Sequence, residues 1–215
     1  VIIDLEHAPL TIEQASTLIA LADARGVAPF VRVSDTSPAA IARILDIGAA
    51  GLLIPHVDTA DDAAAIVDSM RFPPTGHRGS GRMSRAGSWG AGNRNDYTDR
   101  GASVVCMPQI ESTTAVDNIA EIIAVPGVGG VFLGAGDLSL SLGTTPSDPE
   151  VRALLDRVRD ACAAASMPWG AAAIDGAAAR RQLDAGCSFV TLSNDTSALA
   201  SAMKSMIATA TGSDA

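Results

Sequence analysis

Residues 1–7 read VIIDLEH, three β-branched side chains followed by two carboxylates and an imidazole within four positions. β-branched residues favour strands, so this run predicts a strand that ends in Asp4, Glu6 and His7. All three polar side chains then lie at one end of the sheet to which the strand belongs. The first predicted strand therefore delivers acid and base groups to a single place.

Three later apolar runs also end in charged side chains, at Arg32, Glu111 and Asp137. Parallel strands bring their carboxyl ends to the same side of a sheet or barrel, where α/β enzymes place their ligands. We therefore expect these strand ends to converge on one divalent metal ion and one small oxo-acid.

The composition suits one domain, residues 1–215, with an aliphatic core, because 47% of residues are hydrophobic but only 3% are aromatic. A net charge of −9 offers no means of holding a phosphate backbone, and no apolar run approaches the ~20 residues that span a bilayer. We expect neither nucleic acid nor membrane as a partner. Cys106, Cys162 and Cys187 lack metal-ligand spacing, which favours reduced thiols and a cytoplasmic location.

Apolar runs alternate with segments of helical periodicity along the chain. The predicted strands after the first cover residues 28–33, 51–55, 104–110, 130–135, 169–173 and 189–192. The predicted helices include 59–70, 113–124, 176–185 and 197–208, and Thr11 and Ser37 begin two earlier ones as N-caps. Residues 71–100 break the pattern with six glycines and six arginines, and so long a connection predicts a functional loop.

Strict alternation of strands and helices leaves two α/β architectures, an open doubly wound sheet or a closed (β/α)₈ TIM barrel. An open sheet concentrates its ligands at one switch point, whereas the polar strand ends here are spread along the chain. We therefore predict the barrel. The sequence supplies seven strand–helix units, so we expect the first unit to lie upstream of Val1, or the barrel to close unusually.

Glu111 and Asp137 are one strand–helix unit apart and are expected to end neighbouring strands, about 4.8 Å from each other. Two such carboxylates suit a hard ion such as Mg²⁺, which protein sites hold with one or two carboxylates plus water and substrate. The alternative is that each acid merely stabilises a helix N-terminus. Small residues at 134–136 also free backbone N–H groups to face an anion.

Asp4 and His7 suit a base–orienter pair, in which the carboxylate fixes the imidazole tautomer. Arg32 suits an oxyanion or a carboxylate, and an ion pair with Asp4 or Glu6 is compatible with that role. We assign His56, which also follows a strand, only a supporting part. The one lysine, Lys204, lies in the last predicted helix, which excludes a Schiff-base aldolase.

These residues belong to an ordered set of motifs that covers residues 1 to about 199. The motifs are DLEHA at 4–8, Arg32, PPTGHRG at 73–79, QIE at 109–111 and GAGDLS at 134–139. In this order they resemble the HpcH/HpaI aldolase family, the metal-dependent class II pyruvate aldolases. The resemblance implies reversible cleavage of a 4-hydroxy-2-oxo acid into pyruvate, or a close 2-oxo acid, and an aldehyde through a metal-held enolate.

The resemblance also implies a role for each motif residue. Glu111 and Asp137 would be ligands of Mg²⁺ or Mn²⁺, with Co²⁺ or Zn²⁺ as alternatives. His7, oriented by Asp4, would be the catalytic base, and Arg32 would contact the oxo group. The backbone of Ala135, Gly136 and Asp137 would hold the donor carboxylate, and Gln109 would support the site.

The sequence departs from the family at Leu5, where glycine is frequent, and at Ala135-Gly136, where Pro-Ala is frequent; both changes could alter substrate choice. Two other functions compete with the aldolase, a citrate-lyase-β-like acyl-CoA lyase and a non-catalytic binding barrel. The resemblance further implies a homo-oligomer, a trimer or a hexamer, with the helix at about 197–208 exchanged between subunits. We expect the loop at 71–100 and a neighbouring subunit to select the acceptor aldehyde.

Overall fold

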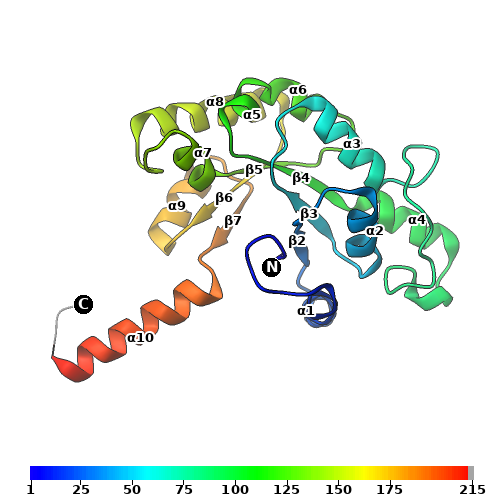
Figure 1. The fold of residues 1–215 in the computed structure, drawn as a ribbon, viewed down its shortest axis with the longest axis horizontal. Helices are drawn as coiled ribbons and strands as arrows, with labels where there is room; N and C mark the ends of the chain where they lie inside the picture. The colour runs from blue at the N-terminus through cyan, green and yellow to red at the C-terminus, as the bar shows by residue number, and fades with distance from the viewer. Residues whose placement is uncertain (213–215) are drawn as a thin grey trace. The chain divides into compact units, whose positions relative to one another are not determined.

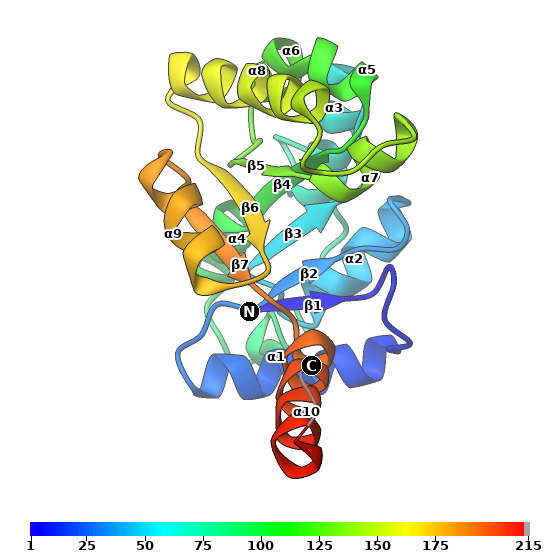
Figure 2. The ribbon, with the colours of Figure 1, turned by 90° about the vertical axis from the view of Figure 1, so that its left-hand side faces the viewer.

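In the computed structural model of the chain, the five parallel strands β1 to β5 lie side by side in chain order (Figure 2). The strands are β1 Ile2–Asp4, β2 Phe30–Arg32, β3 Gly51–Ile54, β4 Val105–Ile110 and β5 Val131–Leu133. The structure describes residues 1–212. β3 and β5 are buried throughout, as expected for a parallel sheet covered by helices.

Helices connect these strands and pack beside one another. They are α1 Ile12–Ala24, α2 Pro38–Asp46, α3 Ala60–Met70, α4 Arg94–Ser103, α5 Thr113–Asp117, α6 Ile119–Ala124, α7 Ala135–Ser141 and α8 Pro149–Ala165. Helix α3 contacts α2 and α6, and α6 contacts α8, so these helices form a row outside the strands (Figure 1). Ile41, Ile44 and Leu45 are the buried stripe of α2.

The chain divides into two compact units, Val1–Trp169 and a second that begins at Gly170. In the second unit, β6 Trp169–Ala173 pairs in parallel with β7 Phe189–Leu192, and α9 Gly176–Asp184 connects them. Helix α10, Asp195–Thr211, follows β7 and has no buried residue. One domain over residues 1–215 stays a prediction. Within the described part of the chain, no helix is long and apolar enough to cross a membrane.

Helix starts follow the predicted caps. Thr11 forms a capping box with Gln14, each side chain accepting a hydrogen bond from the other's backbone N–H. Ser37 caps α2 through the backbone N–H of Ala40, and Pro38 occupies the first turn. These short-range signals fix where α1 and α2 begin after the turns that follow β1 and β2.

The predicted irregular segment 71–100 differs from the structure in its second half. It contains a short 3-10 helix, η1 Ser88–Gly90, and the start of α4. The sequence of α4 is RNDYTDRGAS, with Tyr97 and Gly101 as its buried residues, so it carries no apolar stripe from which to predict it. The predicted helix 113–124 is likewise interrupted, because Asn118 separates α5 from α6.

The loop at 71–100 packs at the amino end of β3. The Arg78 guanidinium donates a hydrogen bond of 2.8 Å to the Asp46 carboxylate, and the backbone N–H of Ala86 donates to the Asp46 carbonyl at 3.0 Å. Asp46 is the last residue of α2, just before β3 begins. This part of the loop therefore lies away from the carboxyl ends of the strands within the same chain.

A glycine in β3 makes room for an aromatic ring of the neighbouring strand. Gly51 and Phe30 are partners in the β2–β3 register, and a Cβ at Gly51 would lie 2.3 Å from the Phe30 ring. We predict that Gly51→Ala lowers the free energy of unfolding by about 1–3 kcal/mol, because the crowded ring must shift. Urea denaturation measures this loss.

Gly79→Ala is the matched control, because nothing lies within 4 Å of a Cβ built at Gly79. Its stability should stay within about 0.5 kcal/mol of the parent protein. Equal stabilities of the Gly51→Ala and Gly79→Ala variants would contradict the packing argument.

Candidate active site

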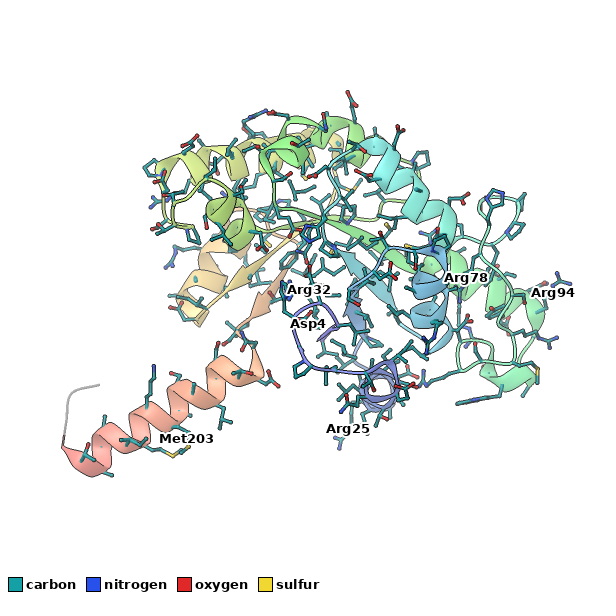
Figure 3. The ribbon with its side chains drawn as sticks, viewed as in Figure 1. Asp4, Arg25, Arg32, Arg78, Arg94 and Met203 are labelled. Atoms are coloured by element: carbon teal, nitrogen blue, oxygen red, sulfur yellow. The ribbon has the colours of Figure 1, made fainter. Side chains whose placement is uncertain are left out.

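Arg32 binds two carboxylates at the ends of β1 and β2. Its Nε and Nη2 donate to Oδ1 and Oδ2 of Asp4 at 2.8 and 2.5 Å, and its Nη1 lies 3.1 Å from Oε2 of Glu6. Asp4 and Arg32 are register partners in adjacent strands, which brings their side chains together (Figure 3). The guanidinium is thus held in one orientation by a bidentate contact and a second acid.

The pKa values of this pair reflect the ion contact. Burial alone raises the pKa of Asp4, but hydrogen bonds from Arg32 and from the Glu6 backbone outweigh it, so the pKa of Asp4 falls below its usual value. The hydrogen bond to Asp4 correspondingly raises the pKa of Arg32. Both groups are therefore charged at neutral pH.

Glu6 lies at the centre of the site, with its side chain 12% exposed. Besides Arg32, it faces two imidazoles: Nε2 of His7 lies 3.7 Å from its Oε2, and Nε2 of His56 lies 3.5 Å from its Oε1. Both imidazole side chains are largely exposed. The arrangement places two potential proton carriers beside one half-buried acid.

The structure gives no contact between the Asp4 carboxylate and the His7 imidazole, both among the described residues, so this pair stays a prediction. Asp4 Oδ1 instead accepts hydrogen bonds from the backbone N–H groups of Glu6 and His7, at 3.0 and 3.4 Å. The chain turns immediately after β1, so the carboxylate of Asp4 caps that turn and binds Arg32. The acid near the His7 ring is Glu6.

Glu111 is a buried carboxylate, 5% exposed, at the end of β4. Its Oε1 accepts the backbone N–H of His56 at 2.8 Å and lies 3.1 Å from the ring Nδ1 of the same residue. Its Oε2 accepts a hydrogen bond from the Gln109 amide. Burial raises the pKa of Glu111, and the negative charge of Asp137 adds to the rise, while the donors from His56 and Gln109 oppose it.

Asp137 lies in the first turn of α7, directly after β5. Gly134 allows the start of this helix to approach β4, because a Cβ there would lie 2.5 Å from the Cβ of Glu111. The backbone N–H groups of Ala135, Gly136 and Asp137 belong to the same turn, where a helix leaves its amides without intrahelical partners. Two acids and a set of amide donors thus share one corner of the site.

A divalent cation fits the pair formed by Glu111 and Asp137. An acid whose pKa is raised by burial and, to a smaller extent, by a second acid is a place where positive charge is stabilising. The carbonyl oxygen of Gln109, in a side chain 3% exposed, is buried without a hydrogen-bond partner among the described residues. Within residues 1–212, no group of three or more His, Cys, Asp or Glu could hold a metal. A pair of carboxylates suits an ion that keeps most of its positions for water and substrate.

His56 and Glu6 are the residues that sequence reasoning undervalued. His56 has a φ of 57°, a left-handed conformation that points both its N–H and its ring toward Glu111. Its position after a predicted strand was the available signal. The sequence placed Glu6 at the correct end of the sheet. Sequence spacing does not show, however, whether Asp4 or Glu6 lies at the centre of the site.

The chain resembles known proteins over most of its length. A family model described as HpcH/HpaI aldolase/citrate lyase matches residues 1–202. A hydroxypyruvate/pyruvate aldolase of Cupriavidus necator is 38% identical over 211 residues, covering 96% of this chain and 78% of the relative. One of Chromohalobacter salexigens is 40% identical over 202 residues, covering 92% and 79%.

A solved structure is also similar to this chain. A HpcH/HpaI aldolase/citrate lyase family protein from Burkholderia cenocepacia matches with a TM-score of 0.90 and 37% identity, covering 96% of this chain and 83% of that one. The predicted fold class, a (β/α)₈-type barrel, is thereby confirmed. With the matching family model and these relatives, the chain belongs to the HpcH/HpaI aldolase/citrate lyase family.

Proposed function

We propose that this protein is a divalent-metal-dependent aldolase, a carbon–carbon lyase. It reversibly cleaves a 4-hydroxy-2-oxo acid into pyruvate, or a close 2-oxo acid, and an aldehyde. The observation that carries the proposal is the buried Glu111 beside Asp137, next to an arginine held by two acids. The two relatives named hydroxypyruvate/pyruvate aldolase support the same reaction class.

Glu111 and Asp137 are the residues that would hold the metal ion. Carboxylates suit Mg²⁺ or Mn²⁺ better than the softer Co²⁺ or Zn²⁺, which favour nitrogen and sulfur ligands. When bound, such an ion supplies Lewis-acid chemistry that makes the methyl hydrogens of pyruvate more acidic. Gln109 keeps Oε2 of Glu111 in place through its amide donor.

Arg32 is the group that we assign to the 2-oxo oxygen. As an enolate forms, negative charge develops on this oxygen, and a guanidinium already oriented by Asp4 and Glu6 stabilises it without further reorganisation. The amides of Ala135, Gly136 and Asp137 would bind the donor carboxylate at the start of α7. Asp4 is then a positioning residue for Arg32.

His7 is the base that we assign to the 4-hydroxyl, with Glu6 as its nearby acid. In the cleavage direction, His7 accepts the hydroxyl proton, the C3–C4 bond breaks, and its electron pair passes into the enolate as the aldehyde leaves. Protonation of C3 then yields the methyl group of pyruvate. In the synthetic direction, the same groups act in reverse order.

A homo-oligomer and a cytoplasmic location are further parts of the proposal. Support for assembly, as a trimer or a hexamer, comes from apolar side chains of α10 that are exposed in the second unit; they are Leu199, Met203, Met206 and Ile207. Support for a reducing compartment comes from Cys106 and Cys162, which are buried and, within the described part of the chain, form no disulfide.

The deciding experiment is exchange of the pyruvate methyl protons in D₂O, followed by NMR with and without Mg²⁺ or Mn²⁺. We predict that Glu111→Gln or Asp137→Asn lowers the exchange rate by about a hundredfold or more, because the ion is then held too weakly to act. Calorimetry should show weaker Mn²⁺ binding in both variants.

Glu121→Gln is the matched control, since Glu121 is an exposed acid of α6. It should exchange pyruvate protons at the parental rate. Exchange that survives chelation of all divalent ions, or that is untouched in Glu111→Gln, would refute the assignment.

A second prediction concerns Arg32. Lysine keeps the charge but cannot reproduce the bidentate contact to Asp4 together with the contact to Glu6. We expect Arg32→Lys to lower methyl-proton exchange by about tenfold or more with Mn²⁺ affinity unchanged.

The comparison variant for Arg32 is Arg43→Lys, because Arg43 is exposed on α2. This variant should leave the rate of methyl-proton exchange and the Mn²⁺ affinity unchanged. If Arg32→Lys weakened Mn²⁺ binding as strongly as exchange, the role at the oxo group would be wrong.

A further inference from the structure

A cavity of about 320 Å³ adjoins the candidate active site. Its lining residues are Glu6, Ser34, Asp35, Thr36, Pro55 and His56. Glu6 is bound to Arg32, and the ring and backbone of His56 contact Glu111. The cavity is therefore continuous with the groups that we assign to the oxo-acid and lies next to them, over the segments that follow β1, β2 and β3.

Two hydroxyl groups in this wall are available to a ligand. Ser34 and Thr36 are exposed, and their hydroxyls have no protein partner among the described residues. Asp35 is engaged differently: its carboxylate accepts hydrogen bonds from the backbone N–H and the hydroxyl of Ser37, at 2.7 and 3.0 Å. These contacts hold the loop between β2 and α2 and so keep Ser34 and Thr36 facing the cavity region.

The charge of the wall is negative. It carries the carboxylates of Glu6 and Asp35 and contains no lysine or arginine among its lining residues. The nearby guanidinium of Arg32 carries one positive charge against the two negative charges of Asp4 and Glu6, so the charge around the cavity stays negative. An aldehyde with a second carboxylate, sulfonate or phosphate would meet like charge here, whereas an uncharged one would not.

Within the same chain, the loop at 71–100 does not line this cavity. Its contacts with Asp46 lie at the amino end of β3, and Arg94 lies at the periphery, away from Asp4 and Arg32 (Figure 3). The expectation that this loop selects the acceptor is not supported by its position in the chain.

We propose that this cavity is the acceptor subsite and that it takes short, uncharged, hydroxylated aldehydes. The inference rests on the proposed aldolase function and adds the acceptor class to it. The hydroxyls of Ser34 and Thr36 hydrogen-bond the hydroxyl groups of the aldehyde, while Glu6 and Asp35 exclude anionic aldehydes. The aldehyde carbon then faces His7 and His56 beside Glu6.

The test uses the full chain with pyruvate and Mn²⁺ and compares glyceraldehyde, propanal and succinic semialdehyde as acceptors. For the parent protein, kcat/KM for glyceraldehyde should exceed that for succinic semialdehyde by about tenfold or more. The double variant Ser34→Ala/Thr36→Val should lower the ratio of kcat/KM for glyceraldehyde over propanal by about tenfold. Because propanal lacks the hydroxyls, the ratio cancels changes in the chemistry common to both aldehydes.

Asp35→Asn keeps one acceptor oxygen for the backbone N–H of Ser37, and its amide N–H can donate to the Ser37 hydroxyl. Because the charge is removed, kcat/KM for succinic semialdehyde should rise by about threefold. Ser80→Ala and Asp99→Asn are the matched controls at exposed positions outside the cavity, and neither should move the ratios. A parent preference for the semialdehyde, or a ratio unmoved by Ser34→Ala/Thr36→Val, would overturn the proposal.

Methyl-proton exchange with pyruvate alone separates the two levels of inference. If the parent protein exchanges protons but its acceptor ratios do not respond, the acceptor subsite is wrong and the aldolase function stands. If the parent protein does not exchange protons with either metal ion, the proposed function fails and the acceptor subsite fails with it.

Discussion

One guanidinium shared by two carboxylates organises the site. Arg32, Asp4 and Glu6 have side chains 21%, 28% and 12% exposed, so water screens them only in part and each charge depends on the others. Asp4 and Arg32 come from adjacent strands in register, and Glu6 reaches back from the turn that follows. This contact joins β1 to β2 and also sets the position of the cation from which the proposed chemistry starts. Removing Arg32 would leave two carboxylates without their cation at the place where substrate is expected.

The other corner of the site depends on the carboxylate of Glu111, whose burial is energetically costly. Glu111 receives donors from the backbone of His56 and from Gln109, yet burial and the charge of Asp137 still raise its pKa. The two acids are not equivalent, because Glu111 is enclosed and Asp137 is exposed on α7. One is therefore fixed by the protein, whereas the other can adjust to a ligand. A positive ion between them would relieve the repulsion that the folded chain otherwise carries.

Much of this arrangement could be predicted from sequence, for reasons visible in particular residues. The apolar runs that end in Arg32, Glu111 and Asp137 are strands, and parallel pairing brings their ends to one side. What could not be predicted was which acid meets which partner: Asp4 and Glu6 are two residues apart, and only the turn after β1 decides that Asp4 takes the bidentate contact. Helix α4 was missed because a helix without an apolar stripe leaves no periodic signal. Packing between strands was equally hidden, as with Gly51 under Phe30 and Gly170 under Phe189.

The backbone of His56 carries a consequence for how such a loop can evolve. With φ at 57°, the residue occupies a region that glycine, asparagine, aspartate and histidine tolerate and that β-branched residues avoid. Its amide anchors Glu111 whatever side chain is attached. This main-chain contact therefore depends on the φ angle of the residue and not on its ring. A homologue could carry asparagine or glycine here and keep the hydrogen bond from the backbone N–H to Glu111. Valine, which disfavours this φ, would lose that hydrogen bond.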